Sequence, residues 1–372
     1  MNTKLFLLFS LFLLSGCDSE DFENFSVFDI NPNIREEIVF QSNPNNRPIY
    51  RIPSVCITNN HTILVACENR QILDDKGDID ILLARKVDKG ISWDKQILFK
   101  MEDGKGRSMN PIFLIDRKIG RIYLFTCHLK DNSKYASFHK KHESDFVYRY
   151  SDDDGESWSN EISLKEKWSL DNNITYIPSA SNGILTSEGT YLVPTMNAKD
   201  GCWYSGLLIK EEGGDWFFSS STPNTGDNEC TVYIDNDNRI VLDCRTYESV
   251  RNKYVYDIKN DKFTQIESDR IDSYLPVKAE ISKCFWKEKT LYLMSYPYTK
   301  TGTRENMSLF GSKDGINWDF LFQFEQGYNG MGYSNVASYQ NKTVIVYESY
   351  GTLIKLMDIS LVMDDIVDLI YK

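Results

Sequence analysis

The chain is long enough for one large repeat fold or two ordinary domains, and it is acidic. Its 372 residues include 54 Asp and Glu against 42 Lys and Arg, which leaves a formal net charge of −12. This charge argues against nucleic acid or an acidic membrane surface as a partner. Any site that binds an anion must therefore be locally basic.

The first residues predict export. Residues 1–4 are a short basic start, and residues 5–14 are an apolar stretch interrupted only by Ser10. That stretch is too short to span a bilayer as a helix, so a signal peptide is the better interpretation. Residues 14–17 resemble the bacterial lipobox, which implies cleavage before Cys17 and lipidation of its thiol and new amino terminus. An ordinary secretory cleavage region around Cys17 is the alternative.

This interpretation divides the chain into a signal peptide at residues 1–16, an acidic linker at 17–38 and a single globular domain at 39–372. We expect lipid chains to tether the domain outside the cytoplasm of a bacterium, at the periplasmic face or the cell surface, with the outer membrane favoured. The protein then meets the membrane only through its anchor. The acidic stretch at residues 18–23 resembles surface-export signals of some Gram-negative lipoproteins, and a solvated linker is the alternative.

The cysteines predict neither a disulfide framework nor a zinc site. Seven remain after Cys17, an odd number without the C-x-x-C spacing of metal sites. Cys230 and Cys244 flank a predicted turn at residues 235–238 and could face each other across a hairpin. A disulfide between them is one hypothesis, and two buried free thiols are the favoured alternative.

Short strands dominate the pattern along the chain, whereas long helical periodicities are few. Runs rich in Ile, Val, Tyr, Phe and Leu alternate with clusters of Asp, Asn, Gly and Ser; examples are residues 79–84, 121–127, 190–194, 239–244 and 343–347. This spacing predicts an all-β fold.

Turns that end in tryptophan repeat between these strands. Residues 151–158 fit the Asp-box pattern S-x-D-x-G-x-[S/T]-W completely. Residues 86–93 fit with Lys in place of the leading Ser, and residues 312–318 fit with one residue deleted and Asn in place of Ser or Thr. A weaker echo ends at Trp216. In such a turn glycine permits the left-handed backbone, Asp and Ser side chains bind the turn amides, and Trp packs beneath.

The spacing of these turns predicts a six-bladed β-propeller. The four tryptophans at positions 93, 158, 216 and 318 are separated by 65, 58 and 102 residues, and the last gap is about two blade periods. Dividing the mature chain by this period gives about six blades, each of four antiparallel strands. The turns indicate the fold and say little about chemistry.

The residues that carry chemistry are scattered. In chain order they are the motif Tyr50-Arg51-Ile52-Pro53, Arg70 with Asp75 five residues later, Glu229, Arg245, Arg304, Tyr333 in Gly-Tyr-Ser-Asn, and Glu348. Their order and spacing, together with the turns, resemble the bacterial exo-sialidases (neuraminidases) over almost the whole chain after residue 40. The resemblance implies a six-bladed propeller and a retaining exo-sialidase. It also implies terminal sialic acids of glycoproteins, glycolipids and oligosaccharides as substrates, with no cofactor and no metal.

The resemblance assigns Arg51, Arg245 and Arg304 to the substrate carboxylate. Sialic acid carries a carboxylate directly on its anomeric carbon, and the planar guanidinium fork binds such a group bidentately at any relevant pH. Glu348 matches the glutamate that holds the first of these arginines by an ion pair. A fixed partner keeps the guanidinium from reorienting between substrates.

The resemblance makes Tyr333 the nucleophile and Glu229 its base. A carboxylate nucleophile would be repelled by the anionic anomeric centre, whereas a neutral phenol can approach and ionise as it attacks. Sialidases are the tyrosine-nucleophile exception among glycosidases. Free tyrosine has a pKa near 10, so it needs a base beside it.

The resemblance makes Asp75 the general acid and Arg70 a substrate-contacting arginine. Proton donation near neutral pH needs a raised pKa, which we expect from partial burial or from neighbouring acids such as Asp74 and Asp78. Asp74 is the competing assignment for the acid.

Other functions remain open on the sequence. One is a propeller that binds sialylated glycans without cleaving them, although binding alone would not need an acid, a base and a nucleophile. Others are a trans-sialidase, an anhydro-forming intramolecular sialidase, or an enzyme that prefers the deaminated sugar Kdn. Linkage preference and oligomeric state also stay open.

Overall fold

The computed structural model describes residues 33–372 except 44, 46, 76, 102–105, 130–143, 168–173, 249, 268–274, 276, 300–302, 326–331 and 351. The predicted signal peptide, Cys17 and residues 18–32 of the linker lie outside these residues. No helix in the described part of the chain is long and apolar enough to cross a membrane.

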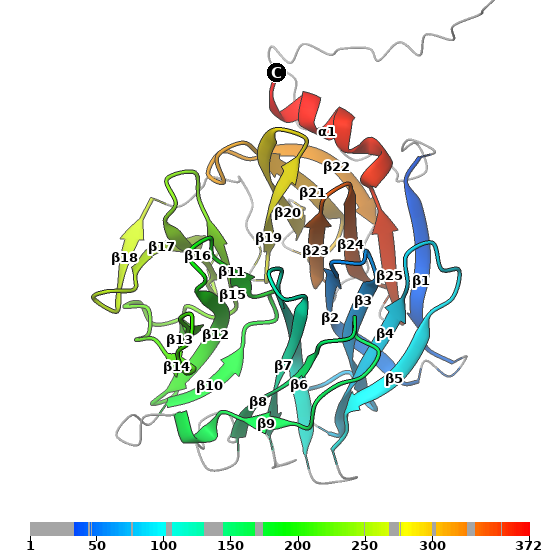
Figure 1. Cartoon of the computed structure of the whole chain (residues 1–372). Helices are drawn as coiled ribbons and strands as arrows, with labels where there is room; N and C mark the ends of the chain where they lie inside the picture. Colours follow the sequence, from blue (N-terminus) through cyan, green and yellow to red (C-terminus); the bar gives the residue numbers. More distant parts are fainter. Residues whose placement is uncertain are drawn as a thin grey trace, which may run out of the picture.

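The regular elements of the described chain are almost all β-strands, as the sequence predicts (Figure 1). In chain order the strands are β1 (Arg35–Gln41), β2 (Ile49–Ile57), β3 (Ile63–Arg70), β4 (Ile79–Lys86), β5 (Asp94–Phe99), β6 (Arg107–Asp116), β7 (Arg121–Leu129), β8 (Ser144–Ser151), β9 (Ile162–Ser163), β10 (Ile174–Pro178), β11 (Ile184–Leu185), β12 (Tyr191–Lys199), β13 (Cys202–Lys210), β14 (Phe217–Phe218), β15 (Cys230–Ile234), β16 (Ile240–Arg245), β17 (Arg251–Asp257), β18 (Lys262–Ile266), β19 (Glu280–Trp286), β20 (Lys289–Pro297), β21 (Met307–Ser312), β22 (Asp319–Glu325), β23 (Ser334–Tyr339), β24 (Lys342–Ser349) and β25 (Leu353–Asp358). Two 3₁₀ turns, η5 (Lys165–Lys167) and η6 (Ser360–Val362), and the helix α1 (Met363–Ile370) complete the elements.

The strands form five sheets. Four of them run β10–β12–β13–β14 with β11 beside β12, β15–β16–β17–β18, β19–β20–β21–β22, and β23–β24–β25–β1. The fifth has eight strands in the order β2–β3–β4–β6–β7–β8–β9, with β5 beside β4. Its two antiparallel halves are joined by one parallel pair, Ile79 with Arg107.

The sheets close into a propeller-like ring. β2 contacts both β6 and β23, and β19 contacts both β15 and β23, so β6, β2, β23, β19 and β15 follow one another around the ring. β1 completes the last sheet by pairing with β25, from Arg35 opposite Asp358 to Gln41 opposite Leu353 (Figure 1). The strand begins at Arg35, before residue 39, where we expected the domain to start. The first and last strands of the described chain therefore meet in one sheet.

The five strand predictions are confirmed, since the predicted segments lie in or overlap β4, β7, β12, β16 and β24. The helix α1 was not predicted. Its buried residues, Met363, Ile366, Val367 and Ile370, follow helical spacing and pack with the cores of the β19–β22 and β23–β25 sheets. A helix of only two turns is too short for its periodicity to be recognised in the sequence among so many strands.

Aromatic rings fill the space between neighbouring sheets. Trp216, which ends the weakest of the repeated turns, is 6% exposed and lies against the rings of Tyr123, Phe125, Tyr148 and Tyr191, with centroids 5.4–6.2 Å away. These partners come from β7, β8 and β12, so the ring of Trp216 joins the eight-stranded sheet to the next. Such edge-to-face contacts add to the large area that each ring buries.

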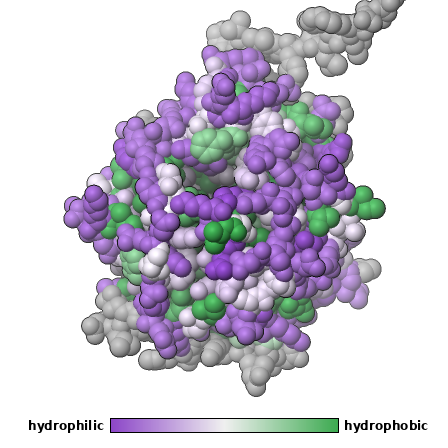
Figure 2. Space-filling view, viewed as in Figure 1, coloured by the Kyte–Doolittle hydropathy of each residue, from purple (hydrophilic) through white to green (hydrophobic). Residues whose placement is uncertain are grey.

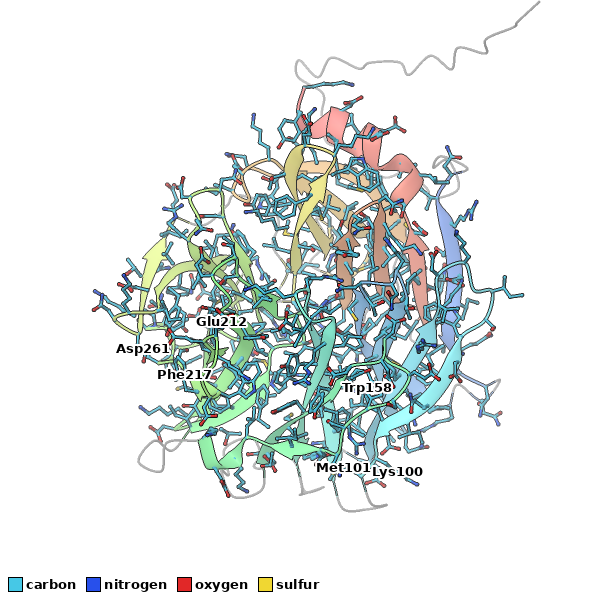
Figure 3. The ribbon with its side chains drawn as sticks, viewed as in Figure 1. Lys100, Met101, Trp158, Glu212, Phe217 and Asp261 are labelled. Carbon is cyan, nitrogen blue, oxygen red and sulfur yellow. The ribbon has the colours of Figure 1, made fainter. Side chains whose placement is uncertain are left out.

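The turn at residues 151–158, whose Trp158 is labelled in Figure 3, is held by its own side chains. The Ser151 hydroxyl accepts a hydrogen bond from the Gly155 amide at 2.9 Å, and Asp153 accepts one from the Ser157 amide at 2.9 Å. Trp158 donates its indole N–H to the Gly155 carbonyl at 3.2 Å. Serine and aspartate thus bind amides that the tight turn leaves without strand partners.

The turn at residues 312–318 repeats the arrangement. The Ser312 hydroxyl accepts from the Gly315 amide at 2.9 Å, and Asp314 accepts from the Asn317 amide at 2.7 Å. This turn is one residue shorter than the full pattern, and it still forms the same kinds of hydrogen bonds to its amides.

Replacing Gly155 by alanine should destabilise the protein. Gly155 has φ +79°, and a Cβ there would lie 2.8 Å from a methyl group of Leu64. The matched control is Gly213→Ala, at φ +73° with nothing within 4 Å of the added carbon. We expect the control to lower the free energy of unfolding by about 1 kcal/mol and Gly155→Ala to lower it by about 1–3 kcal/mol more. Urea unfolding measures both, and equal losses would contradict the packing argument.

Candidate active site

Most of the predicted site residues lie where strands begin or end, at the same end of their sheets. Glu229 and Tyr333 immediately precede β15 and β23, and Arg51 lies near the start of β2. Arg245 ends β16, and Glu348 lies near the end of β24. In an antiparallel pair, the start of one strand and the end of the next lie at the same end of the sheet. The topology thus brings together residues that are far apart in the sequence.

Tyr333 is the centre of this group. It is 8% exposed, and its hydroxyl donates to Glu229 Oε1 at 2.5 Å. Arg245 Nη1 donates to the other carboxylate oxygen of Glu229 at 2.6 Å. A phenol, a carboxylate and a guanidinium therefore form one continuous hydrogen-bonded chain.

Three positive charges surround the phenol. Burial raises the pKa of Tyr333, and Glu229 adds to the rise, whereas Arg245 and Arg304 oppose it. The Cζ atom of Arg51 lies 5.5 Å from the centroid of the Tyr333 ring. Burial and Glu229 thus favour the neutral phenol, whereas the arginines would favour its ionised form.

Glu348 links Arg51 to Tyr333. Its Oε1 accepts from Arg51 Nε at 2.6 Å and from the Ile52 amide at 2.9 Å, and its Oε2 accepts from the Tyr333 amide at 3.3 Å. Burial opposes the charge on Arg51, but Glu348 outweighs it and raises the pKa of the guanidinium. Ile52 has φ +52°, an unfavourable conformation for a β-branched residue, within an irregular stretch of β2. The strained backbone aims its amide at Glu348.

Arg304 approaches Tyr333 along a glycine. It lies between β20 and β21, and its Cδ would be 3.5 Å from a Cβ at position 332. Gly332 has φ +126°, a conformation that favours glycine. Arg304 therefore lies beside the backbone that immediately precedes Tyr333.

A second charged group contains Arg70 and Asp75. Arg70 is 1% exposed and donates through Nη1 to Asp75 Oδ1 at 2.7 Å and to the Leu73 carbonyl at 3.0 Å. Partial burial and neighbouring acids are the two environments expected for Asp75, and the first is absent because its side chain is 59% exposed. The irregular segment between β3 and β4 carries both Asp74 and Asp75 to the surface. The hydrogen bond from the buried Arg70 nevertheless holds the Asp75 carboxyl group in place.

Sequence reasoning missed Glu68. It is fully buried, accepts from Arg70 Nε at 2.6 Å and accepts from the Asn110 amide at 2.8 Å. Burial raises the pKa of Glu68, and Arg70 opposes the rise. Glu68 also lies opposite Arg51 in the pairing of β2 with β3, so it places the Asp75 group beside the Arg51 group. The available signal was the two-residue spacing to Arg70, which puts both side chains on one face of a strand.

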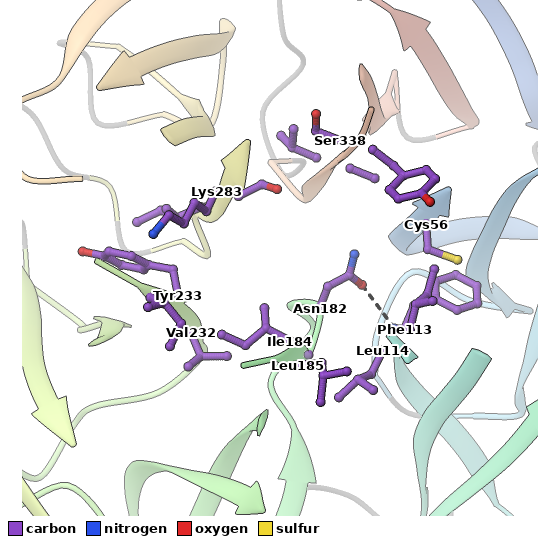
Figure 4. A pocket seen from close by; sticks show the side chains of 18 of the residues that line it. Cys56, Phe113, Leu114, Asn182, Ile184, Leu185, Val232, Tyr233, Lys283 and Ser338 are labelled. Carbon is purple, nitrogen blue, oxygen red and sulfur yellow. Dashed lines mark hydrogen bonds between the residues drawn. The ribbon is translucent and has the colours of Figure 1, made fainter. Parts of the chain in front are cut away.

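The ring also contains a cavity of about 580 Å³ (Figure 4). It is lined by residues further along β2, β15 and β23, such as Ile57, Val232 and Ser338. Asn182 also lines it, and its side-chain oxygen accepts a hydrogen bond from the Phe113 amide at 3.1 Å. Figure 2 shows a hollow near the centre of the ring. None of the predicted site residues lines this cavity, so it is separate from the charged group at the strand starts.

Known proteins resemble this chain over most of its length. The sialidase of Clostridium perfringens is 28% identical over 356 residues, which are 85% of this chain and 91% of that protein. The sialidase of Paraclostridium sordellii is 25% identical over 388 residues, 92% of each.

Solved structures share the fold. The Trypanosoma rangeli sialidase has a TM-score of 0.77 at 16% identity and covers 91% of this chain, whereas this chain covers 62% of its length. The Hadza microbial sialidase Hz136 has a TM-score of 0.76 at 21% identity, with 86% of this chain and 67% of that chain covered. The family model of the BNR repeat-like domain matches residues 62–346, well over half of the sequence. The chain therefore belongs to the BNR repeat-like domain family.

Proposed function

We propose that this protein is a retaining exo-α-sialidase that hydrolyses terminal sialic acids of glycoproteins, glycolipids and oligosaccharides. The observation that carries the proposal is the hydrogen-bonded chain of Tyr333, Glu229 and Arg245. Two curated relatives are sialidases, and structures of the Trypanosoma rangeli sialidase are in complex with sialic acid and with 2,3-difluorosialic acid as a covalent intermediate.

In this proposal, Arg51, Arg245 and Arg304 bind the substrate carboxylate. The charges of Arg245 and Arg304 reach Tyr333, and Arg51 lies beside its ring, so a carboxylate bound by all three sits next to the phenol. Glu348 holds Arg51 in place through Nε, which leaves the two terminal nitrogens of the guanidinium to face the substrate. The protein's overall negative charge makes this local cluster necessary.

Tyr333 attacks the anomeric carbon, and Glu229 receives its proton. The phenol reaches an already anionic sugar without charge repulsion, and the proton moves along an existing 2.5 Å hydrogen bond. The arginines then stabilise the charge that develops on the phenol oxygen. The product of this step is a sialyl-tyrosine.

Asp75 donates a proton to the departing glycosidic oxygen and later accepts one from the water that opens the sialyl-tyrosine. Arg70 orients its carboxyl group. Two displacements at the same carbon return the original configuration, so the product is the retained anomer.

We also propose six blades, with the eight-stranded sheet counted as two. The single pair between Ile79 and Arg107 supports this division, since the remaining pairs of that sheet fall into two antiparallel halves. The side-chain contacts of residues 151–158 and 312–318 support their interpretation as Asp boxes. A count of the sheets in a crystal structure tests the division.

Tyr333→Phe removes the attacking oxygen and keeps the buried ring. We expect hydrolysis of a fluorogenic aryl α-sialoside to fall at least about 100-fold, with an unchanged circular dichroism spectrum. Tyr339→Phe, at the far end of β23, is the matched control and should keep full activity. A folded parent that hydrolyses neither the sialoside nor its Kdn analogue would instead favour a glycan-binding propeller, and release of a 2,7-anhydro sugar in NMR spectra would refute hydrolysis.

Asp75→Ala removes the proposed acid. Substrates with poor leaving groups, such as sialyllactose, should lose about 100-fold or more, whereas activated aryl sialosides need little protonation and should lose less than about 10-fold. Initial rates on both substrates measure the difference. Asp74→Ala is the control, and it should affect neither substrate strongly. Equal losses on both substrates for Asp75→Ala would move the acid role away from Asp75.

We further propose a lipid anchor on Cys17 that holds the protein outside the cytoplasm. The lipobox-like residues 14–17 are the support for this proposal. Cells fed an alkyne-labelled fatty acid should incorporate the label into the parent and not into a Cys17→Ser variant. Equal labelling of the two proteins would contradict the proposed lipid anchor on Cys17.

A further inference from the structure

Two thiols face each other directly behind the candidate active site. Cys230 and Cys244 are opposite each other in the pairing of β15 with β16, and both are fully buried and free. Side chains of directly opposed residues lie on the same face of a sheet. Cys230 immediately follows Glu229, and Cys244 immediately precedes Arg245, so the pair is attached to both partners of the Glu229–Arg245 ion pair.

The backbone around the pair suits a disulfide. The Arg245 amide donates to the Glu229 carbonyl at 2.8 Å, whereas the Cys230 amide donates to the Ser179 hydroxyl and not to Cys244. Because hydrogen-bonded and non-hydrogen-bonded pairs alternate along an antiparallel ladder, Cys230 and Cys244 form a non-hydrogen-bonded pair. The Cα atoms of such a pair are about 4.5 Å apart, within the range of about 4.4–6.8 Å that disulfides adopt.

The two thiols also differ in acidity. Burial opposes ionisation of Cys230, but hydrogen bonds from Cys244, Ser179 and Ser205 outweigh it and lower the pKa of this thiol. Burial and the neighbouring Cys230 raise the pKa of Cys244. Cys230 is therefore the thiol that ionises more readily, and the thiolate is the reacting form.

We propose that Cys230 and Cys244 are an oxidation site whose reversible disulfide lowers the activity, so that the reduced protein is the active form. The inference rests on the proposed sialidase function for its effect and on the cysteine geometry alone for the bond. In the reduced protein Glu229 already contacts both Tyr333 and Arg245. A disulfide draws the two Cβ atoms to about 3.8 Å and changes the local twist of the strands that position Glu229 and Arg245. Misplacement of catalytic groups by about 1 Å is enough to reduce turnover strongly.

The exchange balances with a disulfide oxidant such as oxidised glutathione. The Cys230 thiolate attacks one sulfur of glutathione disulfide and releases one glutathione thiolate, which leaves a mixed disulfide. The Cys244 thiolate then attacks the Cys230 sulfur and releases the second glutathione. Two protein thiols are oxidised, and one glutathione disulfide is reduced to two thiols. Because both cysteines are buried, the exchange proceeds through local opening of the β15–β16 hairpin.

The test equilibrates the full chain in buffers with increasing ratios of oxidised to reduced glutathione. Peptide mass mapping reads the Cys230–Cys244 link, and aryl α-sialoside hydrolysis is measured in the same samples. We expect the linked peptide to accumulate while kcat/KM falls at least about tenfold, with both changes reversed by dithiothreitol. Absence of the link in the most oxidising buffer, or a complete link with unchanged kcat/KM, would overturn the proposal.

Two variants separate the pair from other thiols. Cys244→Ala should keep the activity of the reduced parent and lose the response to oxidised glutathione. Cys202→Ala removes the exposed thiol and should respond as the parent does. If Cys244→Ala does not fold, the mapped link in the parent still decides whether the bond forms. A reduced parent that is inert toward every sialoside refutes the proposed function, whereas the mass measurement still reports on the disulfide.

Discussion

The carboxylate of Glu348 joins the first and last sheets of the ring where the candidate site is built. It accepts hydrogen bonds from the Arg51 side chain and the Ile52 amide, both in β2, and from the Tyr333 amide next to β23. Its own side chain is fully buried, so it cannot exchange these donors for water. A buried ion pair stabilises the fold little against an apolar alternative, but removal of one partner costs about 3–5 kcal/mol because the other charge is left unpaired. The contact therefore specifies geometry more than stability.

Carboxylates and guanidinium groups also alternate around the rest of the site. Glu68 lies between the Arg70 group and Arg51, Glu348 follows Arg51, and Glu229 separates Tyr333 from Arg245. Arg51 and Arg245 each have a carboxylate that fixes one side of the guanidinium, which leaves other nitrogens for a ligand. An acidic protein can in this way present a basic pocket, because each positive group is retained by a specific partner and not by the overall field.

Much of the fold could be predicted from the sequence, because strand periodicity and turn residues are local signals. The β4 and β24 segments and the amide contacts of the turn at residues 151–158 follow from residues within a few positions of one another. Only the contact of Glu68 with Arg70 is local in this sense, since its contact with the Asn110 amide depends on the approach of β6. The helix α1 is too short for its period to stand out. The exposure of Asp75 depends on the path of an irregular segment, for which no periodicity exists.

The pairing of β1 with β25 also orders events during synthesis. Arg35 is opposite Asp358, so the last sheet needs two segments separated by nearly the whole chain. Contacts of such long sequence separation form late, because their loop-closure entropy must be overcome first. Glu348 lies in this sheet and Tyr333 immediately precedes it, so a chain still attached to the ribosome before residue 358 lacks the strand that completes the sheet beside them. An incomplete nascent chain is thereby kept open and without a finished site until its final strand has emerged.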